Sequence, residues 1–114
     1  MEIVQKSKND VRILTPIGRL DVNTSETFRE YILGVIADGT KKIIIDCQSL
    51  DYISSGGLRV VLEAAKKIWQ VNGKMILCSL KDYIQEVFEV AKFDAFLPLA
   101  TSVEDALKQL EDGS

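Results

Sequence analysis

Residues 41–60 read KKIIIDCQSLDYISSGGLRV and contain a strand followed by the start of a helix. The three consecutive isoleucines at 43–45 are typical of a strand covered on both faces, as in the centre of an α/β sheet. A polar, glycine-containing loop is expected over residues 48–57. Residues 58–71 then place apolar side chains at helical spacing, so a buried strand leads into an amphipathic helix. This succession predicts an α/β protein.

The N-terminal segment predicts a β-hairpin. Residues 2–7 and 10–16 are rich in isoleucine, valine and leucine, and turn-forming residues lie between them. Pro16 and Gly18 are expected to end the second strand, because proline lacks the N–H of a sheet ladder and glycine weakens a strand.

A helix is predicted between the hairpin and the isoleucine strand. Asn23 and Glu26 have the spacing of a capping box, in which each side chain bonds a free backbone N–H of the first turn. Phe28 and Ile32 follow at helical spacing, and Gly39 is the expected C-cap.

The remainder of the chain continues to alternate strands with helices. Residues 74–78 predict a buried strand, and Ser79 is expected to cap a helix over 80–91. A proline restricts residues 96–99 to an edge strand, and a second capping box opens a last helix over 101–110.

These elements predict one domain in the order ββαβαβαβα. Residues 1–110 form a mainly parallel central sheet with an antiparallel N-terminal hairpin and four crossover or flanking helices. Residues 111–114 are a short polar tail. Trp69 and Phe88 fall on apolar helical faces and are expected in the core. A chain of 114 residues leaves no room for a second domain.

Composition excludes several classes of function. The chain has no histidine and a net charge of −3, so it lacks the usual general base, the usual zinc ligand and a cationic field for nucleic acid. Neither a phosphate-binding glycine loop nor a dinucleotide motif occurs. Cys47 and Cys78 end apolar runs and are expected to be free, buried thiols. Without a signal peptide or a membrane-spanning run, we expect a cytoplasmic protein with no cofactor and no membrane insertion.

The loop before the second helix carries the most informative polar residues. Ser54, Ser55, Gly56 and Gly57 stand at a helix N-terminus, where free N–H groups and the helix dipole favour an anion. A phosphate on either serine would lie in that field and would add nearly two negative charges. The alternative is an ordinary serine N-cap, with glycines that only allow tight packing.

Residues 16–24 form a second polar segment that leads from a strand to a helix. Loops at the carboxyl ends of parallel strands gather at one side of a sheet, so this segment and the serine loop are predicted to form one surface. The alternative is a solvated loop with a cap at Asn23.

Three motifs make the chain resemble the STAS domain family, and specifically its bacterial anti-sigma factor antagonists. They are Gly18-Arg19-Leu20-Asp21, then Ile43–Asp46 with the loop from Tyr52 to Leu58, then Leu97-Pro98-Leu99 with Thr101. The likeness covers nearly the whole chain, and the order and spacing of the motifs carry it.

The resemblance implies a regulatory protein without catalytic turnover. Unmodified antagonists of this family bind an anti-sigma factor that is also a serine kinase, and this binding frees the sigma factor. Phosphorylation of a loop serine by the kinase abolishes binding, and a serine phosphatase restores it. The alignment places that serine at Ser55, with Ser54, where many members have Asp, as the second candidate. The expected partner contacts are Asp21, Asn23, Thr24, Ser54, Ser55, Gly56, Leu58 and Arg59.

Two other functions remain open for such a monomeric domain. One is a soluble STAS subunit of a membrane transport system that docks on an ATPase. The other is a STAS domain that binds a nucleotide. An enzyme with Ser55 as nucleophile would lack a visible base.

Overall fold

The computed structural model of the chain describes residues 1–92 and 97–112. Its strands and helices follow one another as β1 (Glu2–Lys8), β2 (Val11–Leu20), α1 (Ser25–Ala37), β3 (Lys42–Asp46), β4 (Leu50–Ile53), α2 (Ser55–Gln70), β5 (Lys74–Cys78), α3 (Asp82–Val90), β6 (Leu99–Ala100) and α4 (Val103–Asp112).

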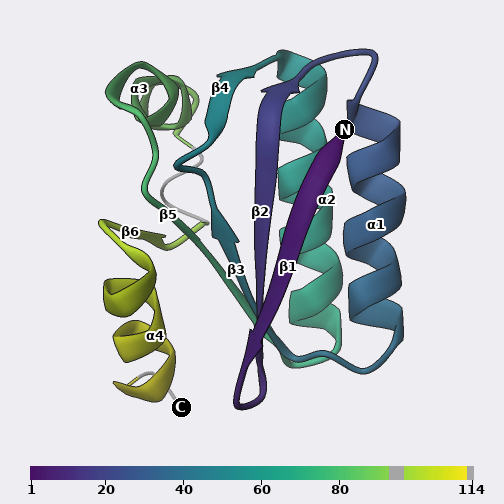
Figure 1. Cartoon of the computed structure of the whole chain (residues 1–114), viewed down its shortest axis with the longest axis vertical. Helices are drawn as coiled ribbons and strands as arrows, with labels where there is room; N and C mark the ends of the chain where they lie inside the picture. Colours follow the sequence, from purple (N-terminus) through teal and green to yellow (C-terminus); the bar gives the residue numbers. More distant parts are fainter. Residues whose placement is uncertain (93–96, 113–114) are drawn as a thin grey trace.

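The strands form one mixed sheet, as the alternation of elements predicted. β1 and β2 pair antiparallel as the N-terminal hairpin, and the other pairings are parallel. The strand order is β1-β2-β3-β5-β6, and β4 pairs with the end of β2 beyond the part that contacts β3 (Figure 1). The predicted α/β fold class is confirmed, with β4 as an added strand.

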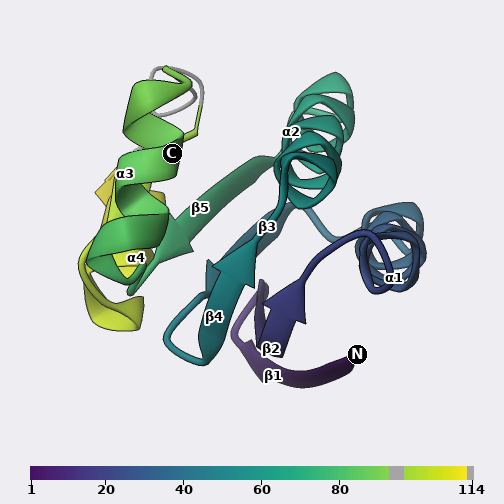
Figure 2. The ribbon, with the colours of Figure 1, turned by 90° about the horizontal axis from the view of Figure 1, so that it is seen from above.

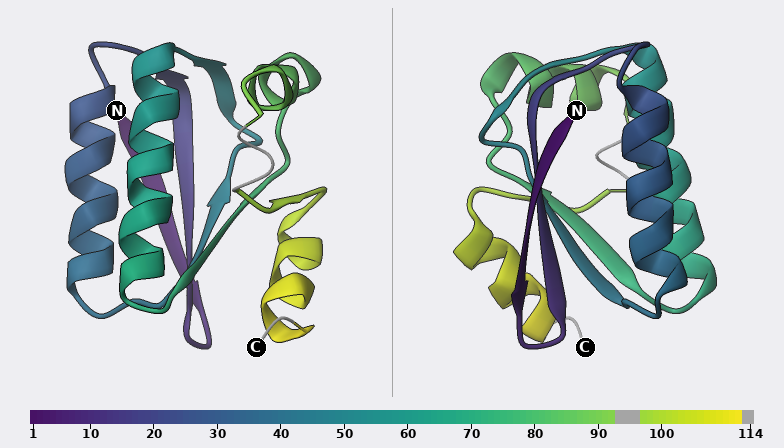
Figure 3. Two further views of the ribbon diagram at one scale, coloured as in Figure 1. Left: turned by 180° about the vertical axis from the view of Figure 1, so that it is seen from behind. Right: turned by 45° about the vertical axis from the view of Figure 1, so that its right-hand side comes forward.

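Helices cover both faces of this sheet. Figures 2 and 3 show α1 and α2 side by side on one face, with α4 on the opposite face. The isoleucine strand β3 packs on both sides. Ile43 and Ile45 belong to the core cluster under α1 and α2, whereas Ile44 belongs to the cluster under α4. All three are at most 2% exposed, which confirms a strand covered on both faces.

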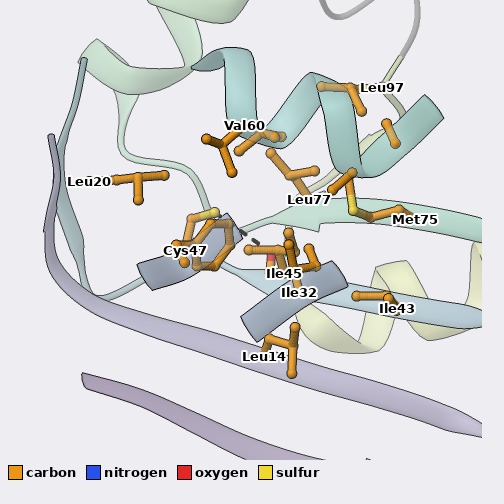
Figure 4. Close-up of a cluster of buried hydrophobic side chains, with 14 of the residues drawn as sticks. Leu14, Leu20, Ile32, Ile43, Ile45, Cys47, Val60, Met75, Leu77 and Leu97 are labelled. Carbon is orange, nitrogen blue, oxygen red and sulfur yellow. Dashed lines mark hydrogen bonds between the residues drawn. The ribbon is translucent and has the colours of Figure 1, made fainter. Parts of the chain in front are cut away.

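The larger core cluster lies between the sheet and the two long helices. Figure 4 shows Leu14 and Ile45 of the strands together with Ile32 of α1 and Val60 of α2. Cys47 belongs to the same cluster, and both cysteines are free and buried, as predicted. Within residues 1–92 and 97–112, no helix combines the length and the apolar content needed to cross a membrane.

Two predictions about strands were wrong. Pro16 and Gly18 do not end the second strand, because β2 continues to Leu20 by pairing with β4 after a register shift at Gly18. The region 48–57 is not wholly a loop, because Leu50–Ile53 form β4 and α2 already begins at Ser55, three residues earlier than predicted. The predicted strand over 96–99 begins among residues outside the described ranges, and β6 is Leu99–Ala100.

The helix starts also differ from the predictions. Asn23 does not cap α1, because the helix begins at Ser25 with Thr24 at the N-cap position and without a side-chain cap bond. Asp21 instead accepts the backbone N–H groups of Asn23 and Thr24. Ser79 does not cap α3, because its backbone has a φ of 59° and α3 begins only at Asp82.

The C-terminal helix is capped one residue later than predicted and ends two residues later. The Ser102 hydroxyl accepts the N–H of Asp105, and the Asp105 carboxylate accepts the N–H of Thr101. α4 extends through Asp112, so the first two residues of the predicted tail are helical.

One of the two aromatic core predictions was wrong. Phe88 is fully buried, but Trp69 is 56% exposed. The buried stripe of α2 passes through Val61, Ala65 and Ile68, and the residue after Ile68 is turned about 100° away from it. Trp69 therefore lies outside the core and lines an apolar hollow with Leu62 and Ala65.

Candidate partner-binding surface

The two polar segments singled out in the sequence lie against each other, as predicted. Leu20 at the end of β2 pairs with Ile53 at the end of β4, and the Leu20 carbonyl accepts the N–H of Ser54 at 2.9 Å. Figure 1 shows both connections at the same end of the molecule, above α1 and α2. We call residues 19–24 and 51–59 together the loop surface.

The two serines of the loop surface have different roles. The Ser54 hydroxyl accepts the N–H of Gly57 at 3.1 Å and is the N-cap of α2. Ser55 is the first residue of the helix and is exposed, and its hydroxyl has no hydrogen-bond partner in the part of the chain that the structure describes. The cap interpretation therefore holds for Ser54, and the hydroxyl of Ser55 is available to a second protein.

Gly57 explains why the helix can begin so close to β2. A Cβ atom at this position would lie 2.8 Å from the Leu20 carbonyl oxygen and 3.0 Å from a side-chain carbon of Ile53. A Cβ atom at Gly56 would meet nothing closer than the Ser54 hydroxyl at 3.6 Å. Only Gly57 is required for the close approach of α2 to the sheet.

The loop between β2 and α1 is organised around Asp21. Its carboxylate accepts the N–H groups of Asn23 at 2.9 Å and Thr24 at 3.2 Å, and its carbonyl accepts the Ser25 hydroxyl. Burial acts to raise the pKa of Asp21, but these hydrogen bonds and the nearby Arg19 outweigh it and lower the pKa below its ordinary value. The Asp21 carboxylate therefore stabilises the loop between β2 and α1 through these hydrogen bonds.

Charged and aromatic side chains also contact one another in and beside the loop surface. The Arg19 guanidinium lies 4.2 Å from the centre of the Tyr52 ring, and its Nε is 3.7 Å from an Asp21 oxygen. Asp51 forms an ion pair with Lys81, and its carbonyl accepts the Tyr83 hydroxyl. These contacts join β2, β4 and the start of α3 into one surface.

The predicted contact residues do not all reach solvent. Leu58 is only 8% exposed, and its side chain packs in the core beneath α2 instead of lying at the loop surface. Arg59 is exposed one turn after Ser55, and Asn23 is exposed on the other loop. The predicted residues that lie at the surface, at least in part, are Asp21, Asn23, Thr24, Ser54, Ser55, Gly56 and Arg59.

Sequence reasoning did not select Arg19 and Tyr52 as site residues. They face each other because Arg19 of β2 pairs with Tyr52 of β4 directly after the register shift, and β4 was not predicted. The signal that was available is that Arg19 and Tyr52 each lie inside a family-like motif. Among the described residues, acidic and cysteine side chains form no group of three that could hold a metal ion.

Comparison with known proteins identifies the family. The family model of the STAS domain matches residues 2–106. A protein of Bordetella bronchiseptica, provisionally named anti-sigma factor antagonist BtrV, is 39% identical over 89 residues, which cover 78% of this chain and 77% of the relative.

Solved structures share the whole fold. A Thermotoga maritima protein, provisionally described as an anti-sigma factor antagonist, has a TM-score of 0.92 at 21% identity, with 96% of this chain and 94% of that one covered. The phosphorylated form of the Bacillus protein SpoIIAA has a TM-score of 0.74 at 22% identity, with 96% and 99% covered. The chain therefore belongs to the STAS domain family and to its group of anti-sigma factor antagonists.

Proposed function

We propose that this protein is a cytoplasmic antagonist that binds an anti-sigma factor through the loop surface and is switched off by phosphorylation of Ser55. In this proposal the anti-sigma factor is a serine kinase, and a serine phosphatase reverses the modification. The protein itself performs no turnover. The observation that carries the proposal is the exposed, unbonded Ser55 at the start of α2, directly beside the loop at residues 19–24.

The geometry favours Ser55 over Ser54 as the modified residue. The Ser54 oxygen already accepts the N–H of Gly57, and phosphorylation would turn this oxygen into a phosphate-ester oxygen, a weaker acceptor for the cap. Loss of a serine cap costs about 1 kcal/mol. Ser55 can be phosphorylated without disturbing any hydrogen bond of the described structure. The existence of SpoIIAA in a phosphorylated form also supports a phosphorylation switch in this fold.

A phosphate at Ser55 would be tolerated in the free protein. The free N–H groups and the dipole of the α2 N-terminus favour an anion, and Arg59 lies at the i+4 position on the same helix face. In a complex the phosphate would have to leave water, and an unpaired buried charge costs several kcal/mol. Since each 1.4 kcal/mol changes affinity about tenfold, charge alone can turn binding off while the fold stays the same.

The test is binding of the anti-sigma factor kinase to variants of Ser55. Ser55→Asp places a negative charge at the position and is expected to weaken binding at least about tenfold, in line with the cost of burying an unpaired charge. Ser55→Ala keeps the site neutral and is expected to bind as the wild type does. Isothermal titration calorimetry of the purified proteins measures both.

The matched control is Ser7→Asp, which introduces the same charge at an exposed serine of β1. It is expected to leave affinity unchanged. Equal affinity of Ser55→Asp and Ser55→Ala would refute the switch. If the wild-type chain instead binds a transport ATPase and no anti-sigma factor, the transport function applies in place of this one.

A further inference from the structure

Arg19 is held in one position on the loop surface by two contacts. Its guanidinium lies 4.2 Å from the centre of the Tyr52 ring, and its Nε is 3.7 Å from the Asp21 carboxylate. Its side chain is nevertheless 61% exposed, and no other ion pair of Arg19 is present among residues 1–92 and 97–112. Arg19 is therefore oriented by two contacts and remains largely exposed, and its guanidinium suits the planar, two-point recognition of a carboxylate.

The unmodified loop surface carries no net negative charge that would repel a carboxylate. The loop surface contains two cations, Arg19 and Arg59, and two carboxylates, Asp21 and Asp51. Lys81 adds a third cation through its ion pair with Asp51. The exposed Asp82 that follows Lys81 balances this cation, so the site has no net charge of its own, although the whole chain has a net charge of −3. A phosphate on Ser55 would add nearly two negative charges and make this surface negative.

We infer that Arg19 is a specificity-determining contact that binds an acidic side chain of the partner protein. This inference rests on the proposed function, which it deepens by stating the chemistry of the partner surface. Stacking on Tyr52 reduces the freedom that Arg19 loses on binding, and pre-organised arginines are frequent among the residues that dominate interface energy. The same acidic partner surface would be repelled by a phosphate on Ser55.

The experiment measures the affinity and the dissociation rate of the anti-sigma factor kinase for variants of this chain. Arg19→Ala is expected to weaken binding about tenfold or more, mainly through faster dissociation, as for a charge pair that is buried on binding. Arg19→Lys keeps the charge but loses the planar fork, and Tyr52→Leu removes the stacking ring; each is expected to weaken binding severalfold. Raising the salt concentration is expected to weaken the wild type more than Arg19→Ala.

The control is Arg12→Ala, which removes an arginine from the opposite end of β2, where it pairs with Asp38 at 3.5 Å. It is expected to leave binding unchanged. Wild-type affinity of Arg19→Ala would overturn the inference, and if Ser55→Asp still weakens binding, the proposed function survives that result. If the wild-type chain binds no anti-sigma factor, both proposals fail together.

Discussion

Gly57 is the residue at which the loop surface and the core depend most directly on each other. Its missing side chain lets the first turn of α2 contact the Leu20 carbonyl, and the same turn presents Ser55 to solvent. The preceding Gly56 has no such contact, since the nearest atom to a Cβ there would be 3.6 Å away. Of these two adjacent glycines, only Gly57 is required by the packing of α2 against β2.

This difference is testable by alanine substitution. Gly57→Ala is expected to lower the free energy of unfolding by about 1–3 kcal/mol, because the added methyl group forces the helix away from β2. Gly56→Ala is the matched control and is expected to change stability by no more than about 1 kcal/mol, in the stabilising direction, because alanine favours a helix. Chemical denaturation followed by circular dichroism measures both, and equal losses for the two variants would contradict the packing account.

At the scale of elements, the short strand β4 determines where the residues of the loop surface lie. It pairs with β2, brings Tyr52 opposite Arg19, and delivers Ser54 to the start of α2. Its two central residues are both exposed, so Leu50–Ile53 lacks the alternation that marks a strand in sequence. Pairing with β2, a contact between residues about thirty apart in the chain, forms this strand, and no local pattern could have predicted it.

The connection from β2 to α1 makes a prediction about pH. The hydrogen bonds to Asp21 hold its pKa below the ordinary value of 3.8, so the carboxylate stabilises the folded state above that pH. This stabilisation is expected to disappear as the pH falls through the lowered pKa of the folded state. Asp21→Asn removes the charge, so its stability deficit relative to the wild type is expected near neutral pH and should vanish in strong acid. Urea unfolding across an acidic pH series gives this difference, and a deficit independent of pH would contradict it.

At the scale of the whole molecule, the sequence predicted those elements whose apolar side chains are buried in the core. The isoleucine strand, the long amphipathic helix and the parallel alternation all follow from apolar patterns that the sheet buries on both faces. Helix starts were less predictable, because Asn23 and Ser79 each match a local cap pattern that tertiary geometry overrides. Both candidate serines were identified from the sequence, but only the structure shows that the Ser54 hydroxyl accepts an N–H, whereas the Ser55 hydroxyl has no partner among the described residues.

The two thiols report on the integrity of the whole fold. Cys47 and Cys78 are at most 1% exposed, and burial raises the pKa of both, that of Cys78 to about 11. Because the thiolate is the reactive form, neither is expected to react with a thiol reagent at about pH 8 in the native protein. Both are expected to react in denaturant, with a midpoint that matches loss of the helical circular dichroism signal. Rapid labelling of one cysteine under native conditions would show that part of the core opens separately.

The phosphorylation of Ser55 is the central claim, and mass spectrometry after incubation with the anti-sigma factor kinase and ATP tests it most directly. The account predicts a gain of one phosphate (about 80 Da), located by peptide mapping at Ser55, lost in Ser55→Ala and retained in Ser54→Ala. A phosphate that survives Ser55→Ala and disappears in Ser54→Ala, or no phosphate at all, would contradict the account.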